Sequence, residues 1–375
     1  MSIVADVDGL FCCGCNACAE ICPRHCISMQ ADAKGFLYPV VDRVACIDCS
    51  ACYKVCPSIT DNISFGFPFA AFAAYNRNER EYLASSSGGA AHVFASYIIG
   101  LGGVVYGCTS EAINVHHIRV TEQEDLSKLQ GSKYVQSNVC GLFSQIKKDL
   151  KANYPVLFVG TPCQVAGLKN YIKHIPEHLY LVDLICHGVP SQQMLHEHIA
   201  HIVRGKIVER LSFRKGPVFC FEIWGKTEYT DKVHQWHYSS EPHKDMYYKA
   251  FLVGISYRES CYHCPFACGN RCSDVTIGDF WGLQDTENLF KNGVSLLLPS
   301  TDKGLQLIEA VEDKMILKEH SVVDAIDGNE QLRHPVKRTF TQKIFKILYP
   351  YLSFDASVLI SLVVKKLKSL FVFSK

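Results

Sequence analysis

The sequence predicts a small α+β domain at the N-terminus, followed by an α/β domain with a mainly parallel sheet and a β-rich insertion. Cysteines crowd roughly the first 60 residues. From about residue 67, short apolar segments of strand length alternate with longer segments of helical period. The length of 375 residues also favours two units, because single domains are usually smaller. We expect domains at residues 1–62 and 67–335 and a tail at residues 336–375.

Composition and charge exclude several classes of function. The 38 basic and 37 acidic residues leave a net charge of +1, which provides no concentrated basic surface for nucleic acid. The start MSIVADVDGLF lacks the basic and apolar regions of a secretory signal, so we expect a cytoplasmic protein. The best apolar run, residues 356–364, ends at Lys365 and is too short to span a bilayer.

The 19 cysteines indicate metal ligation, because they would not persist as disulfides in a reducing compartment and an odd number cannot all pair. The spacing C-x2-C-x2-C-x3-C-P occurs twice and is typical of proteins with two 4Fe-4S clusters. In such proteins the fourth cysteine of each run binds the other cluster. We therefore assign one cluster to Cys12, Cys15, Cys18 and Cys56, and the second to Cys46, Cys49, Cys52 and Cys22.

The alternative for these cysteines is a pair of zinc knuckles, which would leave thiols over. With two full copies of the spacing, the first 60 or so residues resemble bacterial-type ferredoxins, so we expect an α+β ferredoxin-like domain. Cys13 and Cys26 fall outside the spacing, and we interpret them as buried thiols that pack like small apolar side chains.

After a polar linker at residues 58–68, strands alternate with helices. We predict six strands, at residues 69–75, 102–108, 114–120, 155–160, 179–186 and 274–280. We predict four helices, at residues 88–99, 140–151, 163–174 and 191–203. This alternation indicates a mainly parallel sheet covered on both faces. A β-rich insertion at residues 207–238 interrupts it.

Two turns of this domain are candidates for binding a cofactor. Ser86, Ser87, Gly88 and Gly89 precede an apolar helix, where free backbone N–H groups favour a phosphate. The alternative is an ordinary helix cap. The segment Gly131, Ser132, Lys133 and Tyr134 sets a positive charge beside a ring suited to stacking on a flavin. A solvated lysine and a core tyrosine are its plain alternative.

Further cysteines follow predicted strands. Cys163 lies in the first turn of a helix, where the helix dipole favours a thiolate. Cys186 ends the next strand, and neighbouring parallel strands end at one edge of the sheet. Cys261, Cys264, Cys268 and Cys272 alone would make a four-thiolate set for a third cluster or for zinc, and the spacing does not choose between them.

The motifs SSSGG, GSKYVQS, GTPCQVAGLK, DLICHGVPS and SCYHCPF…SDVTIGDFWG together resemble the coenzyme F420 hydrogenase/dehydrogenase beta subunit family. The resemblance implies FAD, a further 4Fe-4S cluster and a deazaflavin or other reducible partner. It makes Cys163, Cys186, Cys261 and Cys264 the ligands of the third cluster, and leaves Cys268 and Cys272 as bystanders or as replacements for Cys163 and Cys186. It also makes both turns contacts of FAD, with Thr161 and Pro162 near the flavin.

We therefore expect an iron–sulfur flavoprotein oxidoreductase that passes electrons between a hydride donor or acceptor at FAD and a partner protein or ferredoxin. One alternative is an electron-transfer subunit that turns over no substrate, and another is a reductase that modifies glycans together with a partner. The sequence identifies no catalytic residue. Among its 16 histidines, His187, beside the proposed ligand Cys186, is the one to test.

The tail at residues 336–375 carries eight Lys or Arg residues against one acidic residue, Asp355. Apolar residues recur between the basic ones, which predicts amphipathic helices on either side of Pro350. Such helices can contact an anionic membrane surface without crossing it. The alternative is a terminal helix that packs on the core of the protein.

Overall fold

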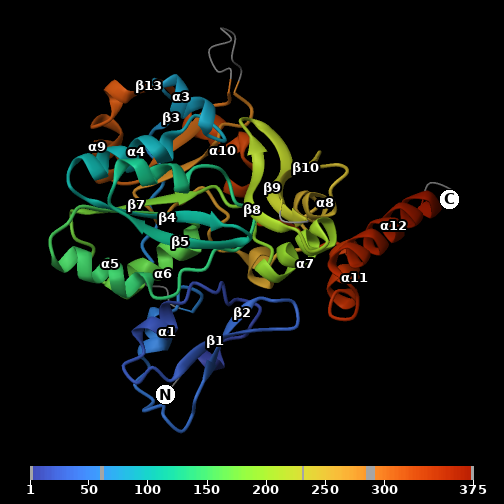
Figure 1. Ribbon diagram of the computed structural model, residues 1–375. Coiled ribbons are helices and arrows are strands. Elements are labelled where there is room, and N and C mark those ends of the chain that lie inside the picture. The colour runs from blue at the N-terminus through green and yellow to red at the C-terminus, as the bar shows by residue number, and fades with distance from the viewer. Residues whose placement is uncertain (1–2, 60–62, 230–231, 284–291, 373–375) are drawn as a thin grey trace.

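The computed structural model describes residues 3–59, 63–229, 232–283 and 292–372. A small N-terminal domain lies below a large central sheet, and the last two helices project from one end (Figure 1). Residues 60–62 of the predicted linker and residues 373–375 of the predicted tail lie outside the described residues.

The N-terminal domain contains a two-stranded antiparallel sheet and two short helices. The strands are β1 (Ile27–Ala31) and β2 (Leu37–Val41), and the helices are α1 (Ala17–Ile21) and α2 (Ala51–Val55). Each helix begins inside one of the two cysteine runs. The predicted α+β character of this domain is confirmed.

The central sheet has eight strands in the order β13-β3-β12-β11-β7-β6-β4-β5. Its four middle strands, β11, β7, β6 and β4, are parallel, as predicted, and antiparallel strands extend it at both edges. The bounds are β3 (Ala71–Asn76), β4 (Val104–Glu111), β5 (Asn114–Val120), β6 (Val156–Gly160), β7 (Leu179–Leu184), β11 (Val275–Asp279), β12 (Ser295–Pro299) and β13 (Met315–His320). Six of them match the predicted strands; β12 and β13 were not predicted.

Helices cover both faces of the sheet. Helices α4 (Ala90–Gly100) and α9 (Asp302–Glu309) pack on one face, and α5 (Leu142–Lys151) and α6 (Pro162–Ile172) pack on the other. The alternation along β6 explains this arrangement, because Leu157 faces α4 whereas Val156 and Phe158 face α6. Helix α3 (Glu79–Ala84) precedes α4, and α10 (Val322–Gly328) follows β13.

The N-terminal domain shares its apolar core with the α5 and α6 side of the sheet. Ile3 and Ala17 belong to the same buried cluster as Phe143 and Val165. The two domains meet closely at Gly167 in α6, where an added Cβ would lie 2.8 Å from the Sγ of Cys15. Because any side chain at this position would push the cysteine away, glycine sets how closely the two domains approach.

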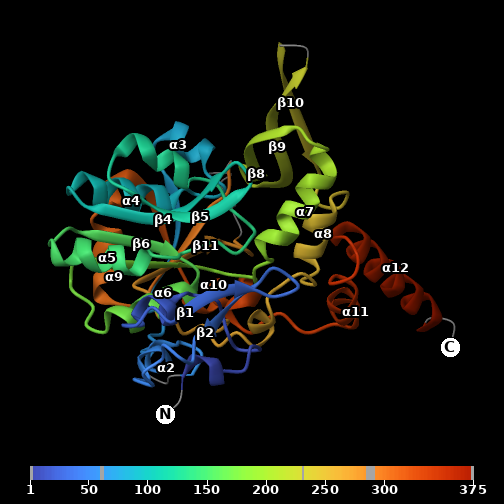
Figure 2. The same ribbon diagram turned by 60° about the horizontal axis from the view of Figure 1, so that its bottom comes forward.

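The insertion is a three-stranded antiparallel sheet of β8 (Ile207–Lys215), β9 (Val218–Tyr229) and β10 (Lys232–Ser240), which confirms the predicted β-rich segment. It packs on α7 (Gln192–Val203) and α8 (Met246–Leu252). Figure 2 shows its long hairpin standing away from the central sheet.

The tail forms α11 (Phe340–Leu348) and α12 (Phe354–Val372). Phe345, Tyr349, Phe354 and Val358 are buried against α7 and α8, so the first part of the tail packs on the core. Further along α12, exposed apolar side chains follow on its outer side: Leu359, Ile360, Val363 and Leu367. Within the part of the chain that the structure describes, no helix is long and apolar enough to cross a membrane.

A buried histidine joins the tail to the body. The Nδ1 of His198 in α7 lies 2.6 Å from the Oδ1 of Asp355 in α12, and its Nε2 lies 3.0 Å from the Oδ2 of Asp245 at the start of α8. Burial lowers the pKa of His198, but the hydrogen bonds to Asp245 and Asp355 outweigh it and raise the pKa to about 9. At neutral pH a charged imidazolium therefore connects three helices.

We expect the change His198→Gln to lower the free energy of unfolding by about 3 kcal/mol near pH 6, because buried Asp245 and half-buried Asp355 lose their cation. The unfolded histidine titrates near pH 6.5, so the stabilisation is fully present below that pH and is lost as the pH rises through about 9. Anaerobic urea unfolding from pH 6 to 9.5 measures the difference between wild type and variant. A difference that stays constant over this range would contradict the charged clamp; exposed His201 on the same helix, changed to Gln, is the control.

Candidate iron–sulfur and cofactor sites

The two cysteine runs adopt the same backbone conformation. In the first run Gly14 and Asn16 have positive φ angles of 69° and 67°, and in the second Asp48 and Ser50 have φ angles of 50° and 57°. These residues occupy equivalent positions between the first three cysteines of each run. Alternation of right- and left-handed residues curls the chain so that neighbouring N–H groups point inward, which is how many anionic iron–sulfur clusters are held. The duplication in sequence is therefore also a duplication in structure.

The structure brings the four cysteines of the first predicted set together. Burial, followed by the charges of Cys12 and Cys56, raises the pKa of Cys18. Burial and the charges of Cys13 and Cys12 raise the pKa of Cys56 to about 12. These mutual effects require thiols that are close to one another. The fourth cysteine of the second run, Cys56, thus lies with the first three of the first run, as the crossed pattern predicts.

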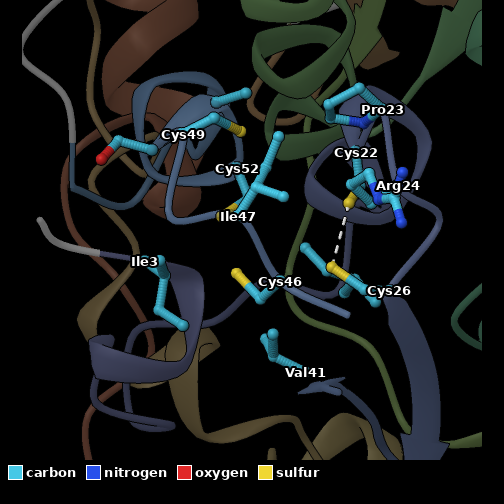
Figure 3. A pocket seen from close by; sticks show the side chains of 13 residues that line it. Ile3, Cys22, Pro23, Arg24, Cys26, Val41, Cys46, Ile47, Cys49 and Cys52 are labelled. Carbon is cyan, nitrogen blue, oxygen red and sulfur yellow. Dashed lines mark hydrogen bonds between the residues drawn. The ribbon is translucent and has the colours of Figure 1, made fainter. Parts of the chain in front are cut away.

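The second predicted set lines a pocket of the N-terminal domain. Cys22, Cys46, Cys49 and Cys52 surround it together with Ile3, Val41 and Ile47 (Figure 3). The Sγ of Cys52 accepts a hydrogen bond from the Val4 N–H at 3.4 Å. Cys26 also lines this pocket, with its Sγ 3.3 Å from that of Cys22. The sequence spacing gave no reason to place Cys26 there.

A third group of thiols gathers where α6, β7 and the segment after α8 meet. Cys163 is the second residue of α6, Cys186 follows β7, and Cys261 and Cys264 belong to the 3-10 turn η3 (Glu259–His263) and its end. Burial and the charge of Cys261 raise the pKa of Cys186 to about 12. Burial and the charges of Cys261 and Cys186 also raise the pKa of Cys264. The four residues implied by the family resemblance are thus neighbours in space.

Cys268 and Cys272 are engaged elsewhere. The thiol of Cys268 donates to the backbone oxygens of Pro265 and Asn270, at 3.5 and 3.3 Å. The buried thiol of Cys272 donates to the oxygen of Pro162 at 3.6 Å. After burial, the nearby carboxylate of Asp183 is the main cause of its raised pKa. These contacts favour the interpretation of both cysteines as bystanders.

Cys13 lies between the first and the third group. A hydrogen bond with Cys13, followed by burial, raises the pKa of Cys163 well above its usual value. A hydrogen bond with Cys13 is also the main cause of the raised pKa of Cys15. Cys13 is half-buried, whereas the sequence predicted a buried thiol. It is also more than a packing residue, because its thiol lies between Cys15 of the N-terminal domain and Cys163 of the α/β domain.

The donor sets fit cubane clusters. Each set consists of four thiols that are buried or half-buried, except for exposed Cys49, and thiolates are the ligands that iron–sulfur clusters take. Among the described residues, no three His, Cys, Asp or Glu side chains converge closely enough to hold a single metal ion. A cubane takes one thiolate on each of its four irons, so its ligands stand apart around the cluster. The same three sets would suit single zinc ions less well.

The two turns predicted to bind FAD lie side by side. The Oγ of Ser86 accepts a hydrogen bond from the Ser132 N–H at 2.9 Å. The Ser87 hydroxyl donates to the oxygen of Val294 at 2.8 Å. A Cβ on Gly88 would lie 2.0 Å from the oxygen of Ala74, whereas one on Gly131 would meet nothing within 4 Å. Gly88 is thus required by packing on β3, while Gly131 faces open space.

The lysine and tyrosine of the second turn are held by the protein itself. The Nζ of Lys133 donates to the backbone oxygens of Cys108, Leu129 and Gln130 at 2.8–3.1 Å. Burial lowers the pKa of Lys133. The Tyr134 ring stacks on Phe251 with 4.7 Å between ring centroids. Neither side chain matches the picture of a free ligand contact, and a flavin would meet mainly Ser86, Gly89, Gly131 and Ser132.

Thr161 and Pro162 stand at the start of α6. Thr161 caps the helix through a reciprocal interaction with Gln164, and Pro162 is the first residue of its first turn. The hydroxyl of Thr161 lies 3.2 Å from the Sγ of Cys163. Gln164 extends the contact to Ser137, whose Oγ lies 2.9 Å from the Nδ1 of His117. Burial lowers the pKa of His117 to about 4, so this network holds a neutral imidazole.

Two arginines near these sites were not predicted. Arg214 of β8 pairs with Asp279 at the end of β11, with 2.6 Å between Nη1 and Oδ2. Arg258, just before Cys261, is fully buried and contacts Cys12 of the other domain. Neither stands in a recognisable motif. The only sequence signal for Arg258 is its position three residues before a proposed ligand.

Comparison with known proteins gives two family matches. Residues 154–325 match the C-terminal part of the coenzyme F420 hydrogenase/dehydrogenase beta subunit, and residues 11–59 match a 4Fe-4S dicluster domain. A comparison with curated proteins found no match.

Among solved structures, the chain is similar to a chain of the xenon-derivatised F420-reducing NiFe hydrogenase complex from Methanosarcina barkeri. The two are 16% identical, over 75% of this chain and 94% of that chain, with a TM-score of 0.43. A likeness at that score is too remote to support a conclusion. The two family matches carry the comparison: residues 154–325 are similar to the C-terminal part of the coenzyme F420 hydrogenase/dehydrogenase beta subunit, and together with the 4Fe-4S dicluster domain they support an iron–sulfur oxidoreductase that transfers electrons.

Proposed function

We propose that this protein is an iron–sulfur flavoprotein that passes electrons between a small hydride donor or acceptor, such as a deazaflavin, and a protein partner. The observation that carries the proposal is the row of three thiol groups. The charges of Cys12 and Cys56 in the first group raise the pKa of the Cys18 thiol, and so does the charge of Cys52 in the second group. Cys13 connects the first group to the third. The row leads from the outer end of the N-terminal domain to the edge of the central sheet.

In this proposal Cys163, Cys186, Cys261 and Cys264 hold a third 4Fe-4S cluster, and the turns at Ser86–Gly89 and Gly131–Ser132 hold FAD. FAD supplies the exchange between hydride transfer and single-electron transfer, and each cluster carries one electron. The residues of the chain have a passive but necessary part. Buried Ile3 and half-buried Val41 line one cluster site and limit the access of water to it, and Gly167 keeps Cys15 close to α6.

The spectrum of anaerobically purified protein tests this function against the alternative of a relay without a substrate. We expect flavin and about twelve irons per chain, and bleaching of the flavin by reduced F420 or another hydride donor. Clusters without flavin would instead identify an electron-transfer subunit, and zinc in place of iron would overturn the proposal.

The cytoplasm is the proposed location, because cluster thiolates need a reducing compartment. We propose in addition that α12 contacts an anionic membrane surface. Leu359, Val363 and Leu367 are each about half exposed, at 48–50%. Exposed Lys365 and Lys366 lie between them, and the only acidic residue of the tail, Asp355, is bound to His198. An exposed apolar side with basic neighbours matches the interface of anionic lipid.

Changing Cys163, Cys186, Cys261 or Cys264 singly to Ser should remove about four irons per chain, because a cubane needs four thiolates. Iron and sulfide analysis of the anaerobic full-length protein measures the loss. The full chain is needed, since the N-terminal domain shares its core with α6. Cys268→Ser and Cys272→Ser are the controls and should keep all the iron; the reverse result would make Cys268 and Cys272 the ligands.

Gly131→Leu should release flavin, because its side chain would enter the open space beside Ser86 and Ser132. The control is Gly102→Leu, which has a similar positive φ of 71° and equally open surroundings but lies beyond the other end of α4. The fraction of bound flavin per chain is the measurement. Equal flavin in both variants would return the two turns to the role of helix caps.

Replacing Leu359, Val363 and Leu367 together by Gln should abolish binding to vesicles that contain phosphatidylglycerol. We expect the wild type to sediment with these vesicles but not with neutral ones, and to dissociate in high salt. The matched control replaces three exposed apolar residues elsewhere, Leu83, Leu101 and Val323. If the α12 variant sediments as well as this control, α12 does not contact the membrane.

A further inference from the structure

Arg258 occupies the junction of the two domains. It caps the start of η3, three residues before Cys261, and its backbone N–H donates to the oxygen of Val189 at 2.9 Å. Its side chain is completely buried, with a relative exposure of 0%. Buried arginines are unusual, because an ionised group loses much of its hydration energy in the protein interior.

The guanidinium group bridges the N-terminal domain and the α/β domain. Its Nε donates to the oxygen of Cys12 at 2.6 Å, and its Nη2 donates to the oxygen of Leu37 at 2.8 Å. Nη2 also lies 3.5 Å from the Sγ of Cys12. Nη1 donates to the Oε1 of Gln136 at 3.2 Å, and the group lies over the Tyr38 ring at 4.3 Å. One side chain thus contacts a predicted cluster ligand, the β1–β2 hairpin and the segment before α5.

The positive charge of Arg258 has no carboxylate partner among the described residues. The other buried arginines of the described residues each have a carboxylate partner. Arg271 lies 2.9 Å from Asp183, and Arg214 lies 2.6 Å from Asp279. The negative charges that act most on Arg258 are those of Cys12, Tyr38, Cys13 and Cys261. Glu259, the next residue in the chain, is paired with Arg338 and Lys346 instead. A buried cation without a compensating anion is strongly unfavourable, so the anion must come from the thiolates of the cluster sites.

We propose that Arg258 is a positioning residue for the first 4Fe-4S cluster. Its side chain holds the ligand Cys12 in place and supplies a positive charge that favours the reduced state of that cluster. The inference rests on the clusters of the proposed function and not on its flavin. Reduction adds one electron to the cluster and makes or breaks no bond of the protein. The added negative charge is stabilised by a buried guanidinium beside it, because the attraction is little screened there. The reduction potential of this cluster is therefore raised.

Redox titration of the anaerobic full-length protein, followed by electron paramagnetic resonance, tests the charge. In Arg258→Gln we expect the ratio of reduced to oxidised first cluster at a fixed potential to fall at least about tenfold, which is 59 mV for a one-electron couple. Arg258→Lys keeps the charge but not the fork, so its shift should be clearly smaller. Iron per chain, measured on each variant, reports whether the cluster is retained.

The control is Arg338→Gln. Arg338 donates to the Oε2 of Glu259, the neighbour of Arg258, at 2.8 Å, but it is partly exposed and paired. Its removal should leave the potential unchanged. A wild-type potential in Arg258→Gln, or an equal shift in Arg338→Gln, overturns the proposal. If Arg258→Gln loses its iron, Arg258→Lys decides: a potential near that of wild type supports the role of the charge, and a full tenfold shift despite the retained charge overturns it. If the wild-type protein contains clusters but no flavin, the proposed flavoprotein function is wrong, but the redox titration still tests the role of Arg258.

Discussion

The contact between the N-terminal domain and helix α6 is the constraint on which the rest of the molecule depends. Helix α6 covers one face of the central sheet, carries Cys163 in its first turn and presents Gly167 to Cys15. Residues 163–167 of this helix therefore contribute a thiol to the third group and also determine how closely Cys15 of the first group approaches α6. Because this contact is part of a continuous apolar core, the two domains behave as one packed body at this point, and the thiol groups keep their order.

The sequence predicted those features that depend on local pattern. The alternation of apolar segments predicted the parallel centre of the sheet and its covering helices, since burial on both faces leaves a periodic trace. Strand β12 was not predicted, because SLLLP is short and buried throughout, and a continuous apolar run does not show which partner it will join. Strand β13 was not predicted, because MILKEH is buried only at Met315 and does not alternate between apolar and polar residues. The cysteine spacing assigned Cys56 to the first set only because the two-cluster pattern itself includes that crossing.

Contacts made across long stretches of chain could not be read in this way. Cys13 directly follows the predicted ligand Cys12 in the sequence. Its contact with Cys163, 150 residues later in the chain, could not be predicted from that position. Arg258 contacts Cys12, which lies 246 residues earlier in the chain. In the two turns, the sequence predicted cofactor contacts for residues that the protein uses itself. Gly88 makes room for a backbone oxygen of β3, and the amino group of Lys133 donates to three backbone oxygens. A residue type that suits a cofactor suits packing as well.

The uneven burial of the cysteines has a consequence for oxidative damage. Cys49 is exposed and Cys46 is half-buried, whereas Cys15 and Cys18 lie inside the shared core. Oxidants reach exposed thiolates first. Cys46 and Cys49 would therefore be oxidised before Cys15 and Cys18, so the second predicted set of thiols would lose a ligand to air before the first.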